Sequence, residues 1–209
     1  MKILLINGSP RKNGNTGILL KEALSGASEY GADAELLPIG DMNIEPCNSC
    51  FVCTDTSECA IEDDMQKVYA KLIEADGIIF GTPVYFWGMT AQLKTVIDRM
   101  FALCASELKL RNKTGGLVVV SARRGNINIA NIFNMFFLYN HMIPTDPIFG
   151  FAGFKEGEIL KDEIAMKGSR ELGRLMVKLI SNGSKIVYPP ECENKTTLNY
   201  LLGKYNLNF

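Results

Sequence analysis

Short apolar runs alternate with helix-like segments along most of the chain, and this alternation limits the possible folds more than any other feature. The first run, KILLIN at residues 2–7, is almost wholly apolar and ends at Gly8. Such a run is typical of a strand that is buried on both faces of a parallel sheet. Strands are predicted at residues 2–7, 32–39, 76–85 and 114–122, with a weaker one around 143–150.

Helices are predicted between and after these strands, at residues 16–30, 61–75, 89–103, 127–139 and 162–180. Strands and helices that alternate at this spacing predict an α/β fold, a doubly wound five-stranded parallel sheet with helices on both faces. Ligands of such sheets bind beyond the carboxyl ends of the strands, so the loops that follow the strands are where a site is expected. We expect one domain over residues 1–181 and a C-terminal arm over 182–209, which carries no recognisable motif.

Charge and hydropathy exclude several classes of function. The formal net charge of −1 offers no basic surface for nucleic acid, and no nucleic-acid-binding motif is recognisable. The apolar N-terminal run is too short for a secretion signal, and no stretch is long enough to span a membrane. We therefore expect a cytoplasmic protein with no membrane or nucleic-acid partner. In a reducing cytoplasm, clustered cysteines more often bind metals or carry out redox chemistry than form disulfides.

The loop after the first predicted strand, GSPRKNGNTG at residues 8–17, suits an anion. Its small residues leave backbone N–H groups free to point at a ligand, and Arg11 and Lys12 add positive charge. The helix that follows adds the positive end of its dipole. The loop matches neither the Walker pattern nor the dinucleotide pattern G-x-G-x-x-G. The alternative is a polar loop in which Asn15 or Thr16 caps the helix.

The loop after the third predicted strand suits a planar ring. Pro83 disrupts the end of the strand, and the backbone N–H groups of residues 84–88 can surround a ring. Three consecutive aromatic residues lie there: Tyr85, Phe86 and Trp87. The alternative places each of them in the core or at a protein interface. Three in a row cannot all face one core, so at least one is expected to face a ligand or a partner chain.

These loops together resemble those of a known family. NGSPRKNGNT resembles the phosphate loop of the flavodoxin-like, NADPH-dependent FMN reductases, and residues 81–99 resemble the family pattern P-x-Y…LK…DR. The resemblance implies a flavodoxin-like sheet, of strand order 2-1-3-4-5, that binds FMN. Within the DR pair, Asp98 and Arg99 are interpreted as structural or interface residues.

The candidate FMN ligands fall into three groups, one for each loop. The resemblance implies that the FMN phosphate is held by Ser9, Arg11, Asn15 and Thr16, with Lys12 and Asn13 as further candidates in the same loop. It implies that the flavin ring is contacted by Pro83, Val84, Tyr85, Phe86, Trp87 and Gly88. The loop after the fourth predicted strand lies at the same edge and adds candidates that can close over the ring: Ser121, Ala122 and Gly125.

Four of the six cysteines form a compact motif, C-x2-C-x2-C-x5-C, made of Cys47, Cys50, Cys53 and Cys59. Repeated short spacings suit a [4Fe-4S] cluster, because one loop must bring several thiolates to several irons. Four-cysteine zinc sites usually combine two C-x2-C pairs that a longer loop separates. Apolar packing, or a motif that no longer carries a cluster, are the alternatives. The single histidine, His141, excludes a His-rich metal site.

This cysteine motif within an FMN-reductase domain resembles the archaeal and clostridial iron–sulfur flavoproteins, over roughly residues 1–180. The resemblance implies an FMN-dependent oxidoreductase that takes electrons from a one-electron donor such as ferredoxin. It implies transfer through the cluster and FMN to a small acceptor, a quinone, O2 or peroxide. It also implies a homodimer or homotetramer in which one subunit's cluster lies near another's flavin. Candidate interface residues are the aromatic residues 85–87 and Phe133, Phe136, Phe137 and Tyr139.

Two other functions stay open from the residues alone. A cluster-free NAD(P)H-dependent FMN or quinone reductase would keep the flavin loops and take hydride directly from NAD(P)H. A redox sensor would use the cysteines to bind zinc, or would switch when they are oxidised. Bleaching of the flavin by NADPH in iron-free protein favours the first, and stoichiometric zinc without turnover favours the second.

Overall fold

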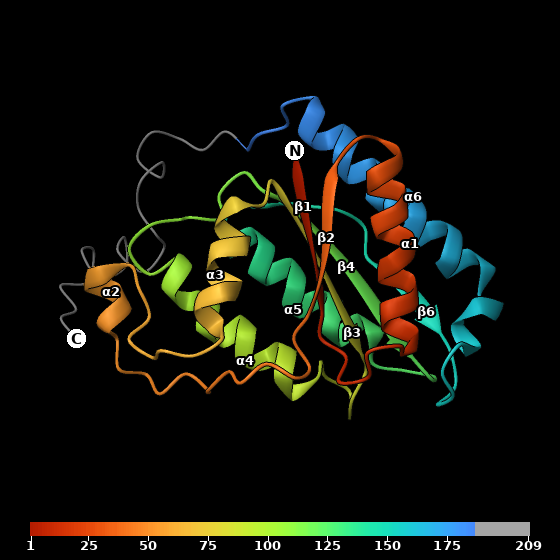
Figure 1. Cartoon of the computed structure of the whole chain (residues 1–209), viewed down its shortest axis with the longest axis horizontal. Helices are drawn as coiled ribbons and strands as arrows, with labels where there is room; N and C mark the ends of the chain where they lie inside the picture. Colours follow the sequence, from red (N-terminus) through yellow and green to blue (C-terminus); the bar gives the residue numbers. More distant parts are fainter. Residues whose placement is uncertain (187–209) are drawn as a thin grey trace.

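The apolar N-terminal run forms strand β1 (Lys2–Asn7), which lies inside a parallel sheet in the computed structural model (Figure 1). The structure describes residues 1–186. The strand order is β2-β1-β3-β4-β5, and β6 also pairs with β4, so the predicted order 2-1-3-4-5 is confirmed. The other strands are β2 (Asp33–Pro38), β3 (Gly77–Pro83), β4 (Thr114–Ser121), β5 (Ile143–Pro144) and β6 (Ile148–Phe151).

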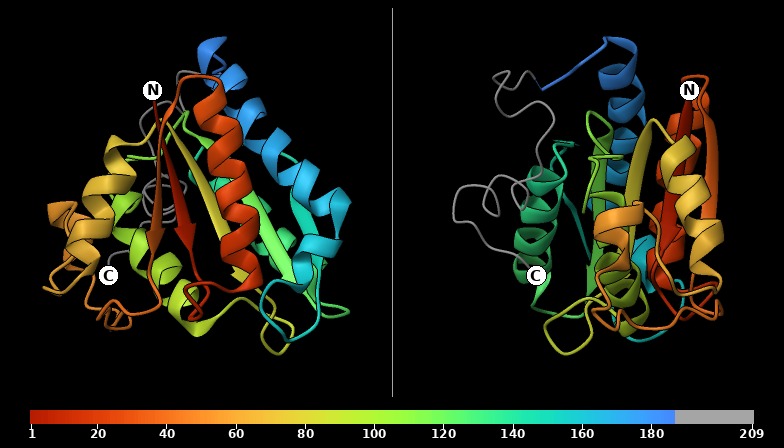
Figure 2. Two further views of the ribbon diagram at one scale, coloured as in Figure 1. Left: turned by 45° about the vertical axis from the view of Figure 1, so that its right-hand side comes forward. Right: turned by 90° about the vertical axis from the view of Figure 1, so that its left-hand side faces the viewer.

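Helices cover both faces of the sheet. Their bounds are α1 (Asn15–Glu29), α2 (Val52–Thr56), α3 (Met65–Glu74), α4 (Ala91–Arg99), α5 (Asn126–Tyr139) and α6 (Glu163–Ser181), with 3-10 turns η1 (Met100–Leu103) and η2 (Glu158–Lys161). Helices α1 and α6 share one core with the sheet, and α3, α4 and α5 share the other. The strands run in one direction, so their carboxyl ends meet at one edge, which is the lower edge in the left view of Figure 2.

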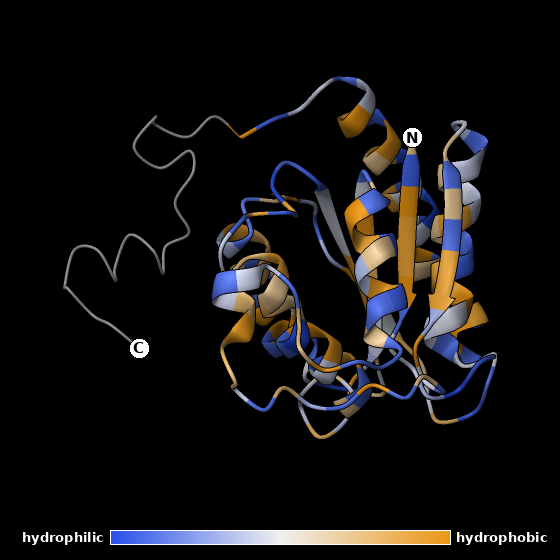
Figure 3. Cartoon of the chain, turned by 60° about the vertical axis from the view of Figure 1, so that its left-hand side comes forward, coloured by the Kyte–Doolittle hydropathy of each residue, from blue (hydrophilic) through white to orange (hydrophobic). Residues whose placement is uncertain are grey.

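The two cores follow from the alternation of side chains along each strand. In β1, Leu4 and Ile6 face the core that contains α3, α4 and α5, whereas Ile3 and Leu5 face the core that contains α1 and α6. Figure 3 accordingly shows β1 as hydrophobic along most of its length, while the neighbouring edge strand β2 alternates in hydropathy. Burial of these apolar side chains is the main favourable contribution to folding.

Two glycines let α1 and α6 approach each other closely. A Cβ atom on Gly173 of α6 would lie 2.0 Å from the carbonyl oxygen of Ala23, and one on Gly26 of α1 would lie 2.0 Å from that of Arg170. Backbone atoms cannot move aside as the end of a flexible side chain can. Contact between the two helices therefore depends on the absence of a side chain at both positions.

Replacing Gly173 with alanine should destabilise the protein by about 1–3 kcal/mol or more, because the new Cβ forces α1 and α6 apart. The thermal midpoint should fall by roughly 2–12 °C for a chain of this size. The matched control is Gly168→Ala on the same helix, where the nearest atom is the tip of Ile148 at 3.3 Å. If both substitutions change the midpoint equally, close helix contact is not what Gly173 provides.

The predicted fifth strand, 143–150, is split into β5 and β6, and both pieces pair with β4. Pro144 and Pro147 lie in and between the two pieces. Proline has no N–H to donate to a ladder, and it restricts the residue before it, so continuous pairing stops here. The predicted helix at 61–75 begins only at Met65, and the short helix α2 was not predicted.

The prediction that Phe133, Phe136, Phe137 and Tyr139 form an interface is wrong for Phe133 and Phe137. Phe133 and Phe137 are each 1% exposed and pack with Phe80 of β3, and Phe136 is partly buried against the same core. Apolar residues lie on every side of α5, and the solvent side is marked only by three asparagines at a spacing of three residues, Asn128, Asn131 and Asn134, all of which are exposed. Of the predicted C-terminal arm, residues 187–209 lie outside the described residues. Within residues 1–186, no helix combines the length and the apolar character that crossing a membrane requires.

Candidate functional site

A cavity of about 140 Å³ opens at the carboxyl edge of the sheet, among the loops that follow β1, β3, β4 and β6. We call it the edge cavity. Nine of its lining residues were predicted from the sequence: Ser9, Arg11, Asn15, Thr16, Pro83, Val84, Tyr85, Ser121 and Ala122. Five were not: Gly14, Val120, Ala152, Gly153 and Phe154. The structure therefore brings the three predicted loops together and adds a fourth.

Two buried hydroxyl groups line the edge cavity and have no hydrogen-bond partner among the described residues. They are Thr16 Oγ1, in the first turn of α1, and Ser121 Oγ, at the end of β4. A buried polar group without a partner costs free energy, so such groups are uncommon away from ligand and water sites. The N-cap of α1, Gly14, makes no side-chain capping bond, so the helix N-terminus is open to a ligand as well.

Arg11 and Asn15, two predicted phosphate ligands, hold the segment that follows β6. Arg11 Nη1 donates to the carbonyl oxygen of Phe154 at 2.7 Å. Asn15 Nδ2 donates to the carbonyl oxygen of Lys155 at 3.0 Å, and its Oδ1 accepts from Ile159 N at 3.4 Å. In this arrangement both side chains close one side of the edge cavity rather than projecting into it.

Of the six predicted phosphate ligands, Lys12 and Asn13 lie outside the edge cavity. Lys12 forms an exposed ion pair with Asp41, with 2.7 Å between Nζ and Oδ2, and Asn13 is exposed. The hydrogen bond and charge of Asp41 raise the pKa of Lys12. The positive charge of Lys12 is thus partly neutralised within the chain, and the hydroxyl groups of Ser9, Thr16 and Ser121 line the cavity instead.

A tight turn carries the predicted aromatic wall. Tyr85 N donates to Gly88 O at 2.9 Å, and Gly88 N donates to Tyr85 O at 3.0 Å. Between them, Phe86 and Trp87 have positive φ angles of 47° and 66° and are 93% and 57% exposed. Bulky residues rarely adopt this backbone conformation. Only Tyr85 of the three aromatic residues lines the cavity, and the rings of Phe86 and Trp87 face solvent.

Gly125 does not line the cavity but supports this turn. Its φ is +105°, and a Cβ there would lie 2.6 Å from Val84 Cγ1. A side chain at position 125 would therefore displace the turn that borders the cavity. The segment from Ala152 to Phe154 was not predicted, because it follows β6, the second part of the weakly predicted fifth strand, which delivers a fourth loop to the same edge.

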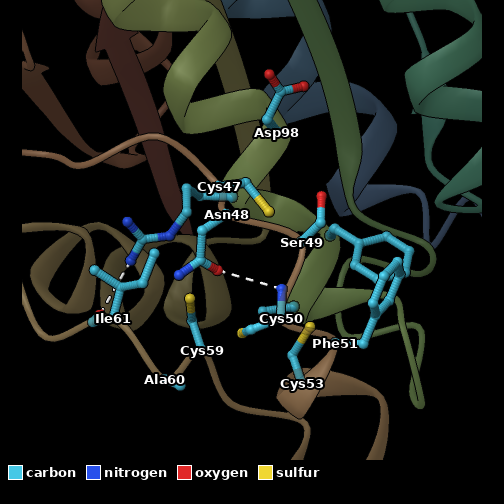
Figure 4. A pocket seen from close by; sticks show the side chains of 13 residues that line it. Cys47, Asn48, Ser49, Cys50, Phe51, Cys53, Cys59, Ala60, Ile61 and Asp98 are labelled. Carbon is cyan, nitrogen blue, oxygen red and sulfur yellow. Dashed lines mark hydrogen bonds between the residues drawn. The ribbon is translucent and has the colours of Figure 1, made fainter.

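A second cavity, of about 420 Å³, lies against the cysteine loop and the end of α4 (Figure 4). We call it the cysteine cavity. All four cysteines of the motif line it: Cys47, Cys50, Cys53 and Cys59. Figure 4 shows their sulfur atoms turned toward a common space. The five cysteines within residues 1–186 are free thiols.

The cysteine loop folds back on itself through unusual backbone angles. Ser49, Phe51 and Ser57 have positive φ angles of 57°, 58° and 60°. Asn48 Oδ1 accepts a hydrogen bond from Cys50 N at 3.2 Å, which supports the first turn. At the other end, Lys109 Nζ donates to Ser57 O at 3.0 Å and ties the loop to the segment after η1. These turns direct thiols from different parts of the loop to one side.

The four thiols also influence one another electrostatically. The pKa of the Cys53 thiol is raised, first by burial and then by the neighbouring Cys59, Cys50 and Cys47. Four thiolates are thus unfavourable together unless a cation or a metal cluster neutralises them. Within residues 1–186, no three His, Cys, Asp or Glu side chains are gathered closely enough to bind one metal ion. The four sulfur atoms therefore line a cavity and do not converge on one position.

Residues 1–156 match the family of NADPH-dependent FMN reductases. An iron–sulfur flavoprotein of Methanocaldococcus jannaschii is 36% identical over 189 residues, which cover 86% of this chain and 97% of that protein. The chain belongs to the iron–sulfur flavoproteins of the NADPH-dependent FMN reductase family. A second such flavoprotein, from Archaeoglobus fulgidus, is 32% identical over 195 residues, which cover 86% of this chain and 95% of its relative.

This iron–sulfur flavoprotein is an FMN-dependent oxidoreductase with a flavodoxin-like fold. A solved structure of a flavodoxin from Agrobacterium tumefaciens superposes with a TM-score of 0.62 at 17% identity, covering 88% of this chain and 98% of that one. At this identity the superposition shows the fold alone. The redox role follows from the family.

The residues of the edge cavity fit part of an FMN. Its buried hydroxyl groups and the α1 N-terminus suit a phosphate and its polar chain. The cavity is smaller than the roughly 300–1,000 Å³ of most ligand pockets, so the whole cofactor does not fit inside it as it stands. Binding therefore requires the flavin ring to lie partly outside, over the 83–88 turn, or that turn and the 152–155 segment to move apart.

Replacing Thr16 with valine tests this fit. Valine keeps the shape and removes the hydroxyl, so FMN should bind about 10- to 100-fold more weakly through the loss of a bond to a charged group. The thermal midpoint of FMN-free protein should not fall, because Oγ1 has no partner there to lose. Titration calorimetry measures the first quantity and thermal unfolding the second. The control is Ser25→Ala on the same helix, whose hydroxyl bonds only Lys21 O; equal weakening by both variants would contradict the assignment.

Proposed function

We propose that this iron–sulfur flavoprotein transfers electrons from a one-electron donor such as a ferredoxin to a small acceptor such as a quinone, O2 or peroxide. FMN would lie at the edge cavity and a [4Fe-4S] cluster in the cysteine cavity. The observation that carries the proposal is the shared cavity of about 420 Å³ that all four motif cysteines line, in a chain whose relatives are iron–sulfur flavoproteins.

The geometry of the thiols supports a cluster over a single zinc ion. Four sulfurs that bind one tetrahedral zinc at about 2.3 Å lie within about 3.8 Å of one another. A cubane places one iron at each of four corners, so its thiolates stand further apart and surround a volume. Cys47, Cys50, Cys53 and Cys59 line such a volume, and they are the residues that would hold the cluster.

When bound, the cluster supplies one-electron chemistry and FMN supplies one- or two-electron chemistry. The protein's own residues bind and orient the two groups. Thr16 and Ser121 offer hydroxyl donors at the edge cavity, and Pro83 to Tyr85 border the place of the ring. Phe51 and Phe101 line the cysteine cavity and add apolar surface beside the thiols. The chain thereby keeps a one-electron site and a two-electron site in separate cavities, which share no lining residue.

We also propose that the protein works as a homodimer or homotetramer, so that one subunit's cluster lies near another's flavin. The support is two sets of exposed apolar side chains, Phe86 and Trp87 on the 85–88 turn and those on the outer side of α5, which the turn approaches at Gly125 before the helix begins. Helix α5 contains no charged residue, and its exposed apolar side chains are Ile127, Ile132, Met135, Leu138 and Tyr139. The molar mass in solution, by light scattering, should be a multiple of the chain mass, and Met135→Glu should lower it. A monomeric wild type would refute this part of the proposal.

A second candidate is a cluster-free NAD(P)H-dependent FMN or quinone reductase. It is favoured by the match of residues 1–156 to the NADPH-dependent FMN reductases. In that function NAD(P)H would be the donor, and the thiols would be dispensable for turnover.

Anaerobic turnover separates the two candidates. Protein with bound FMN is supplied with a quinone and either reduced ferredoxin or NADPH, and consumption of the quinone is followed. The proposal expects faster turnover with ferredoxin and loss of that turnover in Cys50→Ala. NADPH-driven turnover that is faster, and that survives Cys50→Ala unchanged, would establish the reductase instead.

A further inference from the structure

A buried, permanently charged side chain lies at the wall of the cysteine cavity. Arg99, the last residue of α4, lines this cavity, and its side chain is 0% exposed. Arginine stays protonated in proteins, and burial of its charge is costly unless partners compensate for it. The sequence pattern around Arg99 predicts only a structural or interface role, so the side chain's position at the thiols is new information.

Four of the five N–H donors of the Arg99 guanidinium have partners. Nη1 donates to Asp63 Oδ2 at 2.8 Å and to Glu45 O at 2.7 Å. Nη2 donates to Asp63 Oδ1 at 3.2 Å and to Ile61 O at 3.1 Å. Glu45 precedes the first motif cysteine by two residues, and Ile61 follows the last by two. The guanidinium therefore forms hydrogen bonds with the backbone at both ends of the cysteine loop.

The fifth donor, Nε–H, is buried and has no partner among the described residues. The charge lies at the same cavity as the last motif cysteine, since Arg99 and Cys59 both line it and Nη2 bonds the backbone two residues after Cys59. The other charged residue that lines this cavity is Asp98, which pairs with Lys94 on the solvent side at 2.5 Å, whereas Asp63, the 3% exposed partner of Arg99, does not line it. Arg99 is thus the cation nearest the thiols among the residues that line the cysteine cavity.

We infer that Arg99 raises the reduction potential of a cluster held by the four cysteines, through its buried charge and its free Nε–H. This inference rests on the proposed function. One-electron reduction adds one negative charge to a group already surrounded by thiolates. Net charge and hydrogen bonds to sulfur are among the properties that set cluster potentials, so a fixed cation favours the reduced state.

The test is the cluster's midpoint potential, from anaerobic dithionite titration followed by electron paramagnetic resonance. In Arg99→Gln, reduction should become about tenfold less favourable, a fall of about 59 mV for a one-electron couple. In Asp63→Asn the potential should rise, because the cation loses its counter-charge. Arg99→Lys keeps the charge, so its equilibrium constant for reduction should stay within about threefold of the wild-type value. That is a shift in midpoint potential well under the ~59 mV of a tenfold change.

Lys94→Gln is the matched control, since it removes an exposed cation from the same helix and should leave the potential unchanged. Opposite shifts of the midpoint potential in Arg99→Gln and Asp63→Asn support the inference. If the Arg99–Asp63 pair only held the cysteine loop in place, both substitutions would shift the potential in the same direction. Shifts of the same sign, shifts no larger than that of Lys94→Gln, or loss of the cluster from both variants would overturn it. A wild type that binds no iron would remove the proposed function and this inference together, whereas the other outcomes leave the proposed function standing.

Discussion

Replacing Cys50 with alanine should remove the iron from protein purified without oxygen, from about four atoms per chain to fewer than about one. Cys50 is exposed, and its backbone N–H still reaches Asn48 Oδ1 after the substitution, so the fold should survive. A thiolate is the ligand, and alanine offers none. Iron and sulfide assays on the intact variant, alongside its circular dichroism, measure the two expectations.

The control for this prediction is Cys104→Ala. Cys104 is 4% exposed, burial raises the pKa of its thiol to about 12, and its sulfur contacts the carbonyl oxygens of η1 rather than the cysteine cavity. Iron content should therefore stay at the wild-type level. Full iron in Cys50→Ala, or equal loss in both variants, would show that the four-cysteine loop is not the ligand set.

Replacing Asp63 with alanine should destabilise the protein by about 3–5 kcal/mol, because it leaves the Arg99 charge buried without compensation. For a chain of this size that is a fall of roughly 6–20 °C in the thermal midpoint. Asp63 also accepts hydrogen bonds from Glu45 N at 2.8 Å and Met65 N at 2.9 Å, so the loss frees both ends of the cysteine loop. Thermal unfolding of metal-free protein isolates this effect from any metal.

The exposed pair on the neighbouring turn serves as the control, since Asp98→Ala breaks the Lys94–Asp98 bridge and should cost no more than about 1 kcal/mol. A similar small cost for Asp63→Ala would contradict the role of the buried pair.

The buried pair of Asp63 and Arg99 also predicts that the stability of the protein depends on pH. Burial raises the pKa of Asp63, but hydrogen bonds from Arg99 and from the backbone outweigh burial and lower it overall. A carboxyl group whose pKa is lower in the folded protein adds stability above its unfolded pKa, about 3.9, and loses it as the pH falls through the folded value. The free energy of unfolding should therefore decrease below about pH 4 in the wild type, and less steeply in Asp63→Asn. Equal slopes would show that Asp63 does not titrate with folding.

The sequence predicts most of the fold because the strands are apolar runs of the right length between amphipathic helices. It also predicts three of the four loops of the edge cavity, since parallel strands deliver their carboxyl ends to one side. The four cysteines that line the cysteine cavity are identified by their spacing. These features depend on the order of apolar and polar residues, on the spacing of cysteines or on the order of strands. Each of these is visible in the amino-acid sequence.

What the sequence does not predict depends on the orientation of side chains in space. Phe133 and Phe137 were placed on the wrong side of α5 because apolar residues lie all around that helix, and only the exposed Asn128, Asn131 and Asn134 mark its solvent side. Phe86 and Trp87 face solvent because a tight turn with positive φ angles reverses the chain between Tyr85 and Gly88. Arg99 lies at the thiols because Asp63, 36 residues earlier, pairs with it across the loop.

Metal and flavin content per chain tests the central claim most directly. Protein is purified without oxygen, and iron, acid-labile sulfide, zinc and FMN are each measured against chain concentration. The account predicts about four irons and four sulfides, as a cubane contains, with about one FMN and no stoichiometric zinc. FMN without iron, or zinc in place of iron, would contradict it.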